Sequence, residues 1–270
     1  MPSFERLVAE GWDAPVDGWD FSWFEGRATE ERPPWRYASL LDVRMGRATS
    51  ALDIETGGGE VLAGISRRPS RLVATEGWSP NVRRARARLL ASGGSLVAVA
   101  DTPTLPFVDS SFDLVVSRHP VVVLWAEIAR VLRPGGTYLS QQIGAGTNRE
   151  LTDYFLGPQP VNESRSAAAA RAGAQGAGLE IVDLRSCALR VEFFDVGAVV
   201  HFLDKVPWTV PGFTPTAFEA PLRKLHDRIE REGSFVSTAR RLLVEARQPC
   251  RGNGFACITQ QAAVCPGRAP

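Results

Sequence analysis

The sequence lacks an excess of charge of either sign, a long hydrophobic run and a pattern of paired cysteines. Its 31 basic and 30 acidic side chains leave a formal net charge of +1. Such a balance provides no general electrostatic attraction for a nucleic-acid backbone or an anionic membrane surface. Hydrophobic residues make up 44% and charged residues 23% of the chain, which excludes disorder of the whole protein. We therefore expect a globular protein that binds neither nucleic acid nor a membrane.

Long apolar segments are missing from the chain. The runs at 121–125 and 196–203 are far shorter than the roughly 18 apolar residues that span a bilayer. The N-terminal sequence MPSFERLVAEGWD carries Glu5 and Glu10 where a signal peptide needs an apolar stretch. These absences predict a soluble, cytoplasmic protein.

The four cysteines form no C-x-x-C pair, and the three histidines lie well before the cysteine-containing tail. Cys187 stands alone in an apolar segment, which is typical of a small buried side chain. The other cysteines lie in residues 250–270, which we expect to form a flexible tail. The sequence thus predicts no metal site.

The length of 270 residues suits one large α/β domain with additions, or two domains. Residues 1–45 are rich in tryptophan and acid, and they are expected to form a lid or substrate-binding segment. Residues 46–249 are expected to form the main domain. An insert at about 195–234, with an amphipathic helix near 216–232, would cover its cleft.

Short apolar strands alternate with helical patterns in the first half of the main domain. Strands are expected at 49–55, 71–76, 95–101, 112–118 and 137–143. One helix should begin at Ser79, with Pro80 in its first turn, and stop before Gly93, while a second should cover 121–132. Strands connected in this way pack as a parallel sheet with helices on both faces. A ligand of such a sheet binds at the carboxyl ends of the strands.

A glycine-rich turn follows the first of these strands. The strand ends in Asp53, and Glu55 precedes three consecutive glycines, which are Gly57, Gly58 and Gly59. Glycines allow the backbone to bend sharply and to approach a ligand more closely than a Cβ would permit. Taken alone, the run is equally consistent with a simple turn.

Acidic residues follow the next two strands. Glu76 comes after the second strand, where a carboxylate can accept hydrogen bonds from the vicinal hydroxyls of a ribose. Asp101 and Thr102 come after the third, where an acid can accept from an adenine amino group. A glycine turn and two such acids on three consecutive strands together predict an adenosine site.

These segments resemble the class I S-adenosylmethionine-dependent methyltransferases, and among them the broad group of bacterial small-molecule methyltransferases. The resemblance is carried by ALDIETGGGE, VATEGWSPN, ADTPTLPFVDSSFDLVVSRHP and EIARVLRPGGTYLSQQIG. It is dense over residues 50–145 and looser out to about Pro249. The most specific part pairs LPF…FDLVVS with EIARVLRPGG, which is the family's usual run from the fourth strand to the fifth.

The resemblance implies a doubly wound, mostly parallel seven-stranded sheet of the Rossmann-like methyltransferase type, with the last strand antiparallel. Residues 181–194 and 239–248 are the candidates for the final antiparallel hairpin. S-adenosyl-L-methionine is the implied cofactor.

The family's binding residues can be carried over to this chain position by position. Asp53 and the glycines of the turn would line the methionine portion of the cofactor, Glu76 would hold the ribose hydroxyls, and Ser117 would lie beside the methyl sulfonium. Asp101, with Thr102, would bind the adenine amine. The family usually has glycine at the position of Glu55, so this carboxylate would repel the cofactor's carboxylate or attract its ammonium or sulfonium.

Four side chains are candidates for the acceptor side of the site. His119, after the fourth strand, is the best candidate for a general base, and positioning of neighbouring loops is the alternative. Trp35 and Tyr37 could form an aromatic wall for the substrate or pack the N-terminal segment onto the sheet. His201 is a further substrate candidate, with a place in the lid or in the core.

Three other functions remain as alternatives. A glycine turn and a ribose acid also serve nicotinamide oxidoreductases, although no tyrosine here has a lysine four residues later. A nucleic-acid base methyltransferase is disfavoured by the near-neutral charge. A non-catalytic protein that still binds S-adenosylmethionine is kept open by Glu55. The sequence favours a class I methyltransferase that acts on a small organic molecule as a monomer or homodimer.

Overall fold

The computed structural model of the chain describes every residue except 1, 17, 19, 92, 99–103 and 251–270. The strands of the described residues form one eight-stranded sheet in the order β1-β7-β8-β6-β5-β2-β3-β4. Their bounds are Ala28–Glu30 (β1), Ser50–Ile54 (β2), Arg71–Glu76 (β3), Ser95–Ala98 (β4), Phe112–Arg118 (β5), Leu132–Ile143 (β6), Glu180–Phe193 (β7) and Phe235–Arg247 (β8).

The strand directions give the sheet a parallel half and an antiparallel half. β4, β3, β2, β5 and β6 pair in parallel register, whereas β8 is antiparallel to both β6 and β7. The predicted doubly wound sheet with an antiparallel last strand is confirmed. The sheet has one strand more than the seven expected, because β1 pairs with the outer edge of β7. A strand of three residues is too short to reveal itself by alternation of apolar and polar residues.

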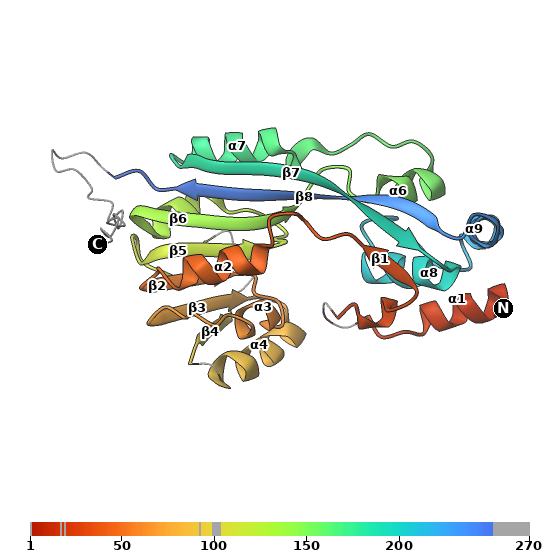
Figure 1. The fold of residues 1–270 in the computed structure, drawn as a ribbon, viewed down its shortest axis with the longest axis horizontal. Coiled ribbons are helices and arrows are strands. Elements are labelled where there is room, and N and C mark those ends of the chain that lie inside the picture. The colour runs from red at the N-terminus through yellow and green to blue at the C-terminus, as the bar shows by residue number, and fades with distance from the viewer. Residues whose placement is uncertain (1, 17, 19, 92, 99–103, 251–270) are drawn as a thin grey trace, which may run out of the picture.

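Helices cover both faces of the parallel half (Figure 1). The helices are α1 (Phe4–Trp12), α2 (Tyr37–Met45), α3 (Glu60–Ala63), α4 (Ser79–Ala91), α5 (Trp125–Val131), α6 (Arg149–Leu156), α7 (Ala167–Gly176), α8 (Val196–Lys205) and α9 (Glu219–Glu232), with 3-10 turns at Ser22–Phe24 and Glu163–Arg165. Leu41, Leu62 and Leu89 from α2, α3 and α4 share one buried cluster with the sheet. Ile128 and Ala174 from α5 and α7 belong to the cluster on the opposite face. Within the described residues, no helix is long and apolar enough to cross a bilayer.

The helix expected from Val121 begins only at Trp125. The backbone N–H of Val121 donates to the Glu55 carboxylate, and its carbonyl oxygen accepts from Arg165. Both backbone groups of Val121 are therefore bonded to side chains from other elements, and the first residues of the expected helix form a loop instead. By contrast, α4 begins at Ser79 and ends before Gly93, as its N-cap and stop signals predict.

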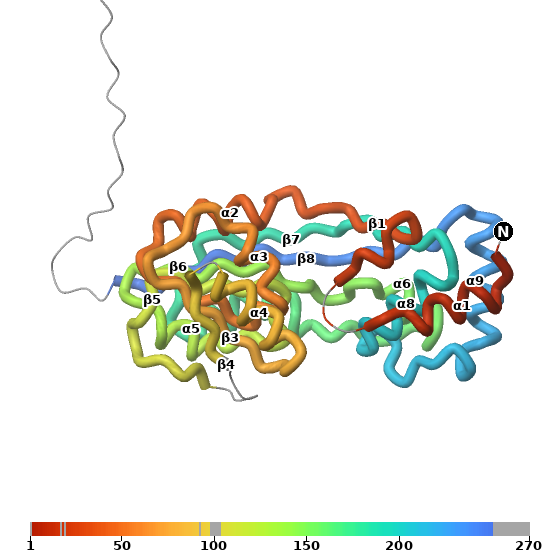
Figure 2. Tube along the Cα trace, turned by 90° about the horizontal axis from the view of Figure 1, so that it is seen from below, coloured from red at the N-terminus to blue at the C-terminus, as the bar shows by residue number. Residues whose placement is uncertain are grey.

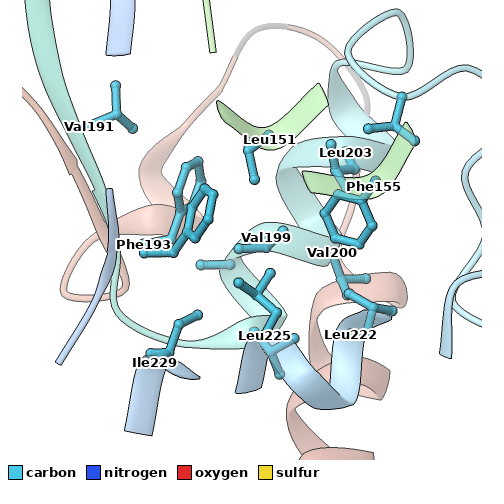
Figure 3. Packing of buried hydrophobic residues seen from close by; sticks show 14 of the residues in the cluster. Leu151, Phe155, Val191, Phe193, Val199, Val200, Leu203, Leu222, Leu225 and Ile229 are labelled. Carbon is cyan, nitrogen blue, oxygen red and sulfur yellow. The ribbon is translucent and has the colours of Figure 1, made fainter. Parts of the chain in front are cut away.

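The antiparallel hairpin extends beyond the rest of the sheet and carries a second hydrophobic core. β7 and β8 pair continuously from Glu180 opposite Arg247 to Phe193 opposite Phe235, apart from one irregularity near Ile181. The far end of this hairpin is packed by α1, α6, α8 and α9 (Figures 1 and 2). Side chains from these elements, such as Leu151, Val199, Leu225 and Phe193, form the second core (Figure 3). The expected amphipathic helix near 216–232 is α9.

Candidate functional site

Two buried carboxylates lie at the carboxyl ends of adjacent parallel strands. Asp53 lies near the end of β2 and Glu76 ends β3, and they are 7% and 6% exposed. Burial above all, with a smaller contribution from the charge of Glu76, raises the pKa of Asp53 to about 7. Because the charge of Glu76 contributes to the raised pKa of Asp53, the two carboxylates lie close together at this edge of the sheet. The structure thus brings together the residue that the resemblance assigns to the methionine portion of the cofactor, Asp53, and the one that it assigns to the ribose, Glu76.

The backbone after β3 orients the Glu76 carboxylate. Its Oε1 accepts hydrogen bonds from the N–H groups of Gly77 at 2.9 Å and Trp78 at 2.8 Å. Within the described residues, the side-chain hydrogen bonds of Glu76 all use this one oxygen. Oε2 can therefore accept from a ligand, which is the geometry that a ribose hydroxyl requires.

The glycine turn between β2 and α3 needs glycine for its conformation and for the packing behind it. Gly57 and Gly59 have φ values of 64° and 81°, which side chains rarely adopt. A Cβ at Gly59 would lie 3.4 Å from the Cα of Ala85 in α4. Arg88 of the same helix donates to the carbonyl oxygen of Gly58 at 2.6 Å. The turn is thus held from behind by α4 and presents backbone without side chains, which fits a closely bound cofactor.

Glu55 departs from this pattern in both its backbone and its side chain. Its φ is 55°, in the left-handed region where glycine is favoured. Its Oε2 accepts a hydrogen bond from the backbone N–H of Val121 at 2.7 Å. The side chain therefore reaches from the turn after β2 to the loop after β5, across the edge at which the methionine portion of a cofactor would lie.

Ser117 lies next to the turn, since its Cα pairs with that of Ile54 in the β2–β5 ladder. Its Oγ shares hydrogen bonds with the Tyr138 hydroxyl at 2.8 Å and with the Ser140 hydroxyl at 2.9 Å. Its carbonyl oxygen accepts from the Tyr37 hydroxyl at 2.9 Å. Ser117 is therefore fixed on both its side-chain and its backbone oxygen, and its place beside the methyl sulfonium stays a prediction.

Two side chains in series, Trp35 and Gln141, orient His119. The indole N–H of Trp35 donates to Gln141 Oε1 at 2.8 Å, which directs the Gln141 amide N–H towards His119 Nε2 at 3.0 Å. An amide nitrogen only donates, so Nε2 of His119 accepts and the proton of the ring lies on Nδ1. The backbone of His119 has a φ of 57°, and its N–H donates to the Gln141 carbonyl oxygen at 2.7 Å.

The surroundings of His119 make its ring a weak base. Burial above all, with the positive charges of Arg118 and Arg241, lowers the pKa of His119 to about 3. The ring is therefore neutral near pH 7 and provides an oriented hydrogen-bonding group. The catalytic base role of His119 stays a prediction, and the low pKa favours the alternative of positioning.

The two N-terminal aromatic residues cover the ends of β5 and β6. Trp35 and Tyr37 are 6% and 7% exposed and belong to the buried cluster that lies on the sheet. Their polar atoms bond Gln141 and the Ser117 carbonyl, as described above. Burial above all, with the charge of Asp53, raises the pKa of Tyr37 well above its usual range, so Tyr37 remains a hydrogen-bond donor. These contacts show that Trp35 and Tyr37 pack the N-terminal segment onto the sheet, whereas their role as an aromatic wall for the substrate stays a prediction.

The structure does not bring every predicted residue to this edge. His201 lies on α8, in the second core, with its ring centroid 4.5 Å from that of Trp23 and 5.0 Å from that of Phe24. It belongs to the packing of that core, away from Asp53 and the glycine turn (Figure 1). Asp101 and Thr102 lie outside the described residues.

Sequence reasoning missed the polar residues of β6. Ser140 and Gln141 are almost fully buried, yet both contact the predicted site through Ser117 and His119. The signal was present, because a run of polar residues inside a central strand is unusual unless each finds a partner. The Trp35 partner of Gln141 could not be found from the sequence, since the two residues are far apart in the chain.

The fold is an α/β domain of the Rossmann-like methyltransferase type. Residues 52–140 match the family described as "Methyltransferase domain". The chain is 34% identical over 118 residues to the ubiquinone/menaquinone biosynthesis C-methyltransferase UbiE of Laribacter hongkongensis, a match covering 39% of this chain and 47% of that protein. It is 33% identical over 132 residues to the malonyl-[acyl-carrier protein] O-methyltransferase of Geobacter sulfurreducens, covering 46% and 49% respectively.

A crystal structure of a putative methyltransferase from Bacillus halodurans C-125 shares the fold, with a TM-score of 0.57 and 18% identity over 80% of this chain and 99% of that one. The chain spans about half the length of the curated relatives that it matches. Residues 52–140 are thus similar to methyltransferase domains, and the fold is of the Rossmann-like methyltransferase type.

Proposed function

We propose that the protein is a methyltransferase that transfers the methyl group of S-adenosylmethionine to a small organic acceptor. The observation that carries this proposal is the convergence of Asp53, Glu76 and the bare glycine backbone at the carboxyl edge of the sheet. This edge belongs to the segment that matches the methyltransferase family. Carboxylates beside exposed backbone provide the acceptors and the close approach that an adenosyl group needs.

Each residue of the edge receives a role in this proposal. Glu76 accepts from the ribose hydroxyls through Oε2, while the turn at Gly57–Gly59 receives the methionine portion. Asp101 and Thr102 are retained as the adenine-binding residues proposed from the sequence. Ser117, fixed by Tyr37, forms the wall beside the reacting methyl group.

Bound there, S-adenosylmethionine would supply a methyl group to a nucleophilic atom, leaving S-adenosylhomocysteine and releasing any proton that the nucleophile carried. The protein's own contribution is to exclude water and to hold the acceptor in line, at about 3–3.5 Å from the methyl group. Trp35 and Tyr37 close the edge against water. His119 orients the acceptor through its neutral ring, and burial, aided by the charges of Arg118 and Arg241, keeps that ring uncharged.

The division of the chain follows from the same roles. Residues 1–45 contribute Trp35 and Tyr37 to the acceptor side, residues 46–249 bind the cofactor, and the insert at about 195–234 extends the domain. We expect the protein to act in the cytoplasm, as a monomer or homodimer.

Isothermal titration calorimetry of the full chain tests the proposal. S-adenosylmethionine and S-adenosylhomocysteine should each bind once per chain, whereas oxidised and reduced nicotinamide dinucleotides should not bind. Binding of a nicotinamide dinucleotide in place of the sulfur cofactors would contradict the proposal and support an oxidoreductase.

A second function, cofactor binding without turnover, is favoured by Glu55. Its left-handed backbone and its bond to Val121 put a carboxylate where the family usually has glycine. The two functions separate when the protein is incubated with S-adenosylmethionine labelled in the methyl group and an extract of small molecules. An enzyme transfers label into the extract, whereas a binding protein retains it in the cofactor.

A further inference from the structure

A cavity of 460 Å³ lies beyond the carboxyl end of β6, beside the proposed methyl-transfer site. Its walls come from the loop after β6, the N-terminus of α7 and neighbouring stretches of β7 and β8. Its lining includes four arginines, Arg149, Arg165, Arg240 and Arg241, and one carboxylate, Glu163. Positive charge therefore predominates in this cavity, although the whole chain is almost neutral.

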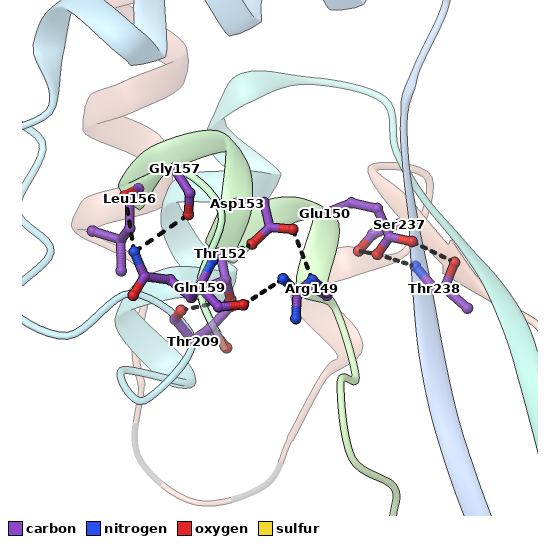
Figure 4. Close-up of polar contacts among 10 residues, drawn as sticks. All are labelled: Arg149, Glu150, Thr152, Asp153, Leu156, Gly157, Gln159, Thr209, Ser237 and Thr238. Atoms are coloured by element: carbon purple, nitrogen blue, oxygen red, sulfur yellow. Dashed lines mark hydrogen bonds and ion pairs between the residues drawn. The ribbon is translucent and has the colours of Figure 1, made fainter. Parts of the chain in front are cut away.

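Not all of this charge is neutralised by the protein. Arg149 pairs with Asp153 at 2.8 Å (Figure 4), and Arg241 pairs with Glu30. Within the described residues, no hydrogen bond or ion pair is recorded for the Arg240 guanidinium, and the bond recorded for that of Arg165 is to a carbonyl oxygen. In the part of the chain that the structure describes, neither Arg240 nor Arg165 is thus paired with a carboxylate.

The cavity wall is held in a defined position. The carboxylate of Glu150 in α6 accepts from the Ser237 hydroxyl at 3.1 Å and from the N–H and hydroxyl of Thr238 at 3.0 and 2.7 Å (Figure 4). The N–H of Gly144 donates to the Arg240 carbonyl oxygen at 2.8 Å. A Cβ at Gly144 would lie 3.0 Å from the Cβ of Arg240, so the absence of a side chain at Gly144 leaves room for the Arg240 side chain.

A helix terminus adds to the positive potential. Ser166 caps α7 by accepting from the N–H of Ala169, and both Ser166 and Ala167 line the cavity. The first turn of a helix carries N–H groups without helical partners and a partial positive charge. Together with the guanidinium groups of Arg240 and Arg165, this helix terminus provides donors and charge for an anion.

Two contacts join the cavity to the proposed methyl-transfer site. Arg165 donates to the carbonyl oxygen of Val121 at 3.2 Å, and the backbone N–H of Val121 donates to Glu55 in the glycine turn. Arg241 is close enough to His119 for its charge to act on the ring. A molecule with one end in the cavity would therefore lie next to the loop that follows β5.

We propose that this arginine cavity binds an anionic group, a phosphate or a carboxylate, of the molecule that accepts the methyl group. The assignment to the acceptor rests on the proposed function, whereas anion binding itself does not. Planar guanidinium groups bind both kinds of oxyanion through paired hydrogen bonds. A cavity of 460 Å³ is large enough to hold the anionic end of a small-molecule acceptor.

Calorimetric titration of the full chain with pyrophosphate and with citrate tests the cavity. One anion should bind per chain, and its dissociation constant should rise at least tenfold in Arg240→Gln and in Arg165→Gln. The matched control is Arg171→Gln, because Arg171 is an exposed arginine of α7, the helix whose first turn lines the cavity, but does not itself line the cavity. Tighter binding of pyrophosphate identifies a phosphate site, and tighter binding of citrate identifies a carboxylate site.

The affinity for S-adenosylhomocysteine, measured on the same variants, separates this proposal from the proposed function. This affinity should be unchanged in Arg240→Gln, and a saturating concentration of the anion should not displace S-adenosylhomocysteine. The proposal is overturned if no anion binds saturably, if Arg171→Gln weakens binding as much as Arg240→Gln, or if the anion competes with S-adenosylhomocysteine. Specific anion binding without S-adenosylhomocysteine binding would support the anion site and contradict the proposed function alone.

Discussion

The carboxylate of Glu55 accepts a hydrogen bond from the backbone N–H of Val121 at 2.7 Å and so joins the turn after β2 to the loop after β5. Each of these segments would contact a different part of a bound substrate pair, the cofactor on one side and the acceptor on the other. The bond also places a negative charge at the edge of the sheet. Glu55 should therefore influence which cofactors bind.

Glu55→Gln should change the preference between S-adenosylmethionine and its decarboxylated form. Both molecules carry the ammonium and sulfonium groups, and only S-adenosylmethionine carries the carboxylate. The ratio of their dissociation constants therefore reports the effect of Glu55 on the cofactor's carboxylate. Removing one charge several ångströms away should raise the relative affinity for S-adenosylmethionine roughly tenfold. Calorimetric dissociation constants of both cofactors check this, and an unchanged ratio would mean that Glu55 does not face the methionine portion.

Asp53→Asn should alter the pH dependence of folding stability. The pKa of Asp53 is raised from its ordinary 3.8 to about 7, so between these values the folded chain binds more protons than the unfolded chain. Stability contributed by Asp53 therefore falls as the pH rises through this window. From pH 4 to pH 8 the wild type should lose on the order of 4 kcal/mol relative to the variant. Urea unfolding at several pH values measures this, and parallel profiles would contradict the raised pKa.

The His119 ring should stay neutral well below pH 6, because its pKa is lowered to about 3. Its Nδ1 should carry the proton, since Nε2 accepts from Gln141. Nitrogen-15 NMR of the histidine rings, assigned with His119→Gln, follows both features from pH 8 to pH 5. A titration of His119 with a midpoint between pH 6 and 7 would restore it as an effective general base.

Tyr37→Phe should destabilise the protein by about 1–2 kcal/mol, because it leaves the buried carbonyl oxygen of Ser117 without its donor. Tyr154→Phe is the matched control. The Tyr154 hydroxyl donates to the Pro221 carbonyl oxygen at 3.0 Å in the second core.

Both Tyr→Phe changes remove one hydrogen bond to a backbone carbonyl, but only Tyr37 lies at the proposed site. Thermal unfolding and S-adenosylhomocysteine titration together should show lost stability in both variants and weaker binding in Tyr37→Phe alone. Equal binding losses in the two variants would indicate a general effect of stability.

The central strands and the order of the residues that follow them could be predicted from the sequence. Their apolar runs are local signals, and parallel pairing brings their carboxyl ends to one edge. The hairpin of β7 and β8 was expected from the family resemblance, and its two long strands confirm it.

Other features depend on contacts between distant residues. The helix α5 begins at Trp125 and not at the expected Val121, because Val121 forms hydrogen bonds with Glu55 and Arg165, and no local pattern reveals these bonds. The place of His201 in the second core depends on α8 packing against the N-terminal aromatic residues. Likewise, the arginines of the cavity are spread over α6, the 3-10 turn Glu163–Arg165 and β8, so their assembly depends on the fold.

The most direct test of the account compares the S-adenosylhomocysteine affinity of Glu76→Ala with that of Asp113→Ala. Each carboxylate accepts from two backbone N–H groups, but Asp113 bonds Thr49 and Ser50 at the amino ends of the strands, opposite the proposed site. We predict that Glu76→Ala weakens binding by about 1–3 kcal/mol, measured by calorimetry, while Asp113→Ala leaves it unchanged. Equal affinities in wild type and Glu76→Ala would contradict the claim that this edge of the sheet holds an adenosyl group.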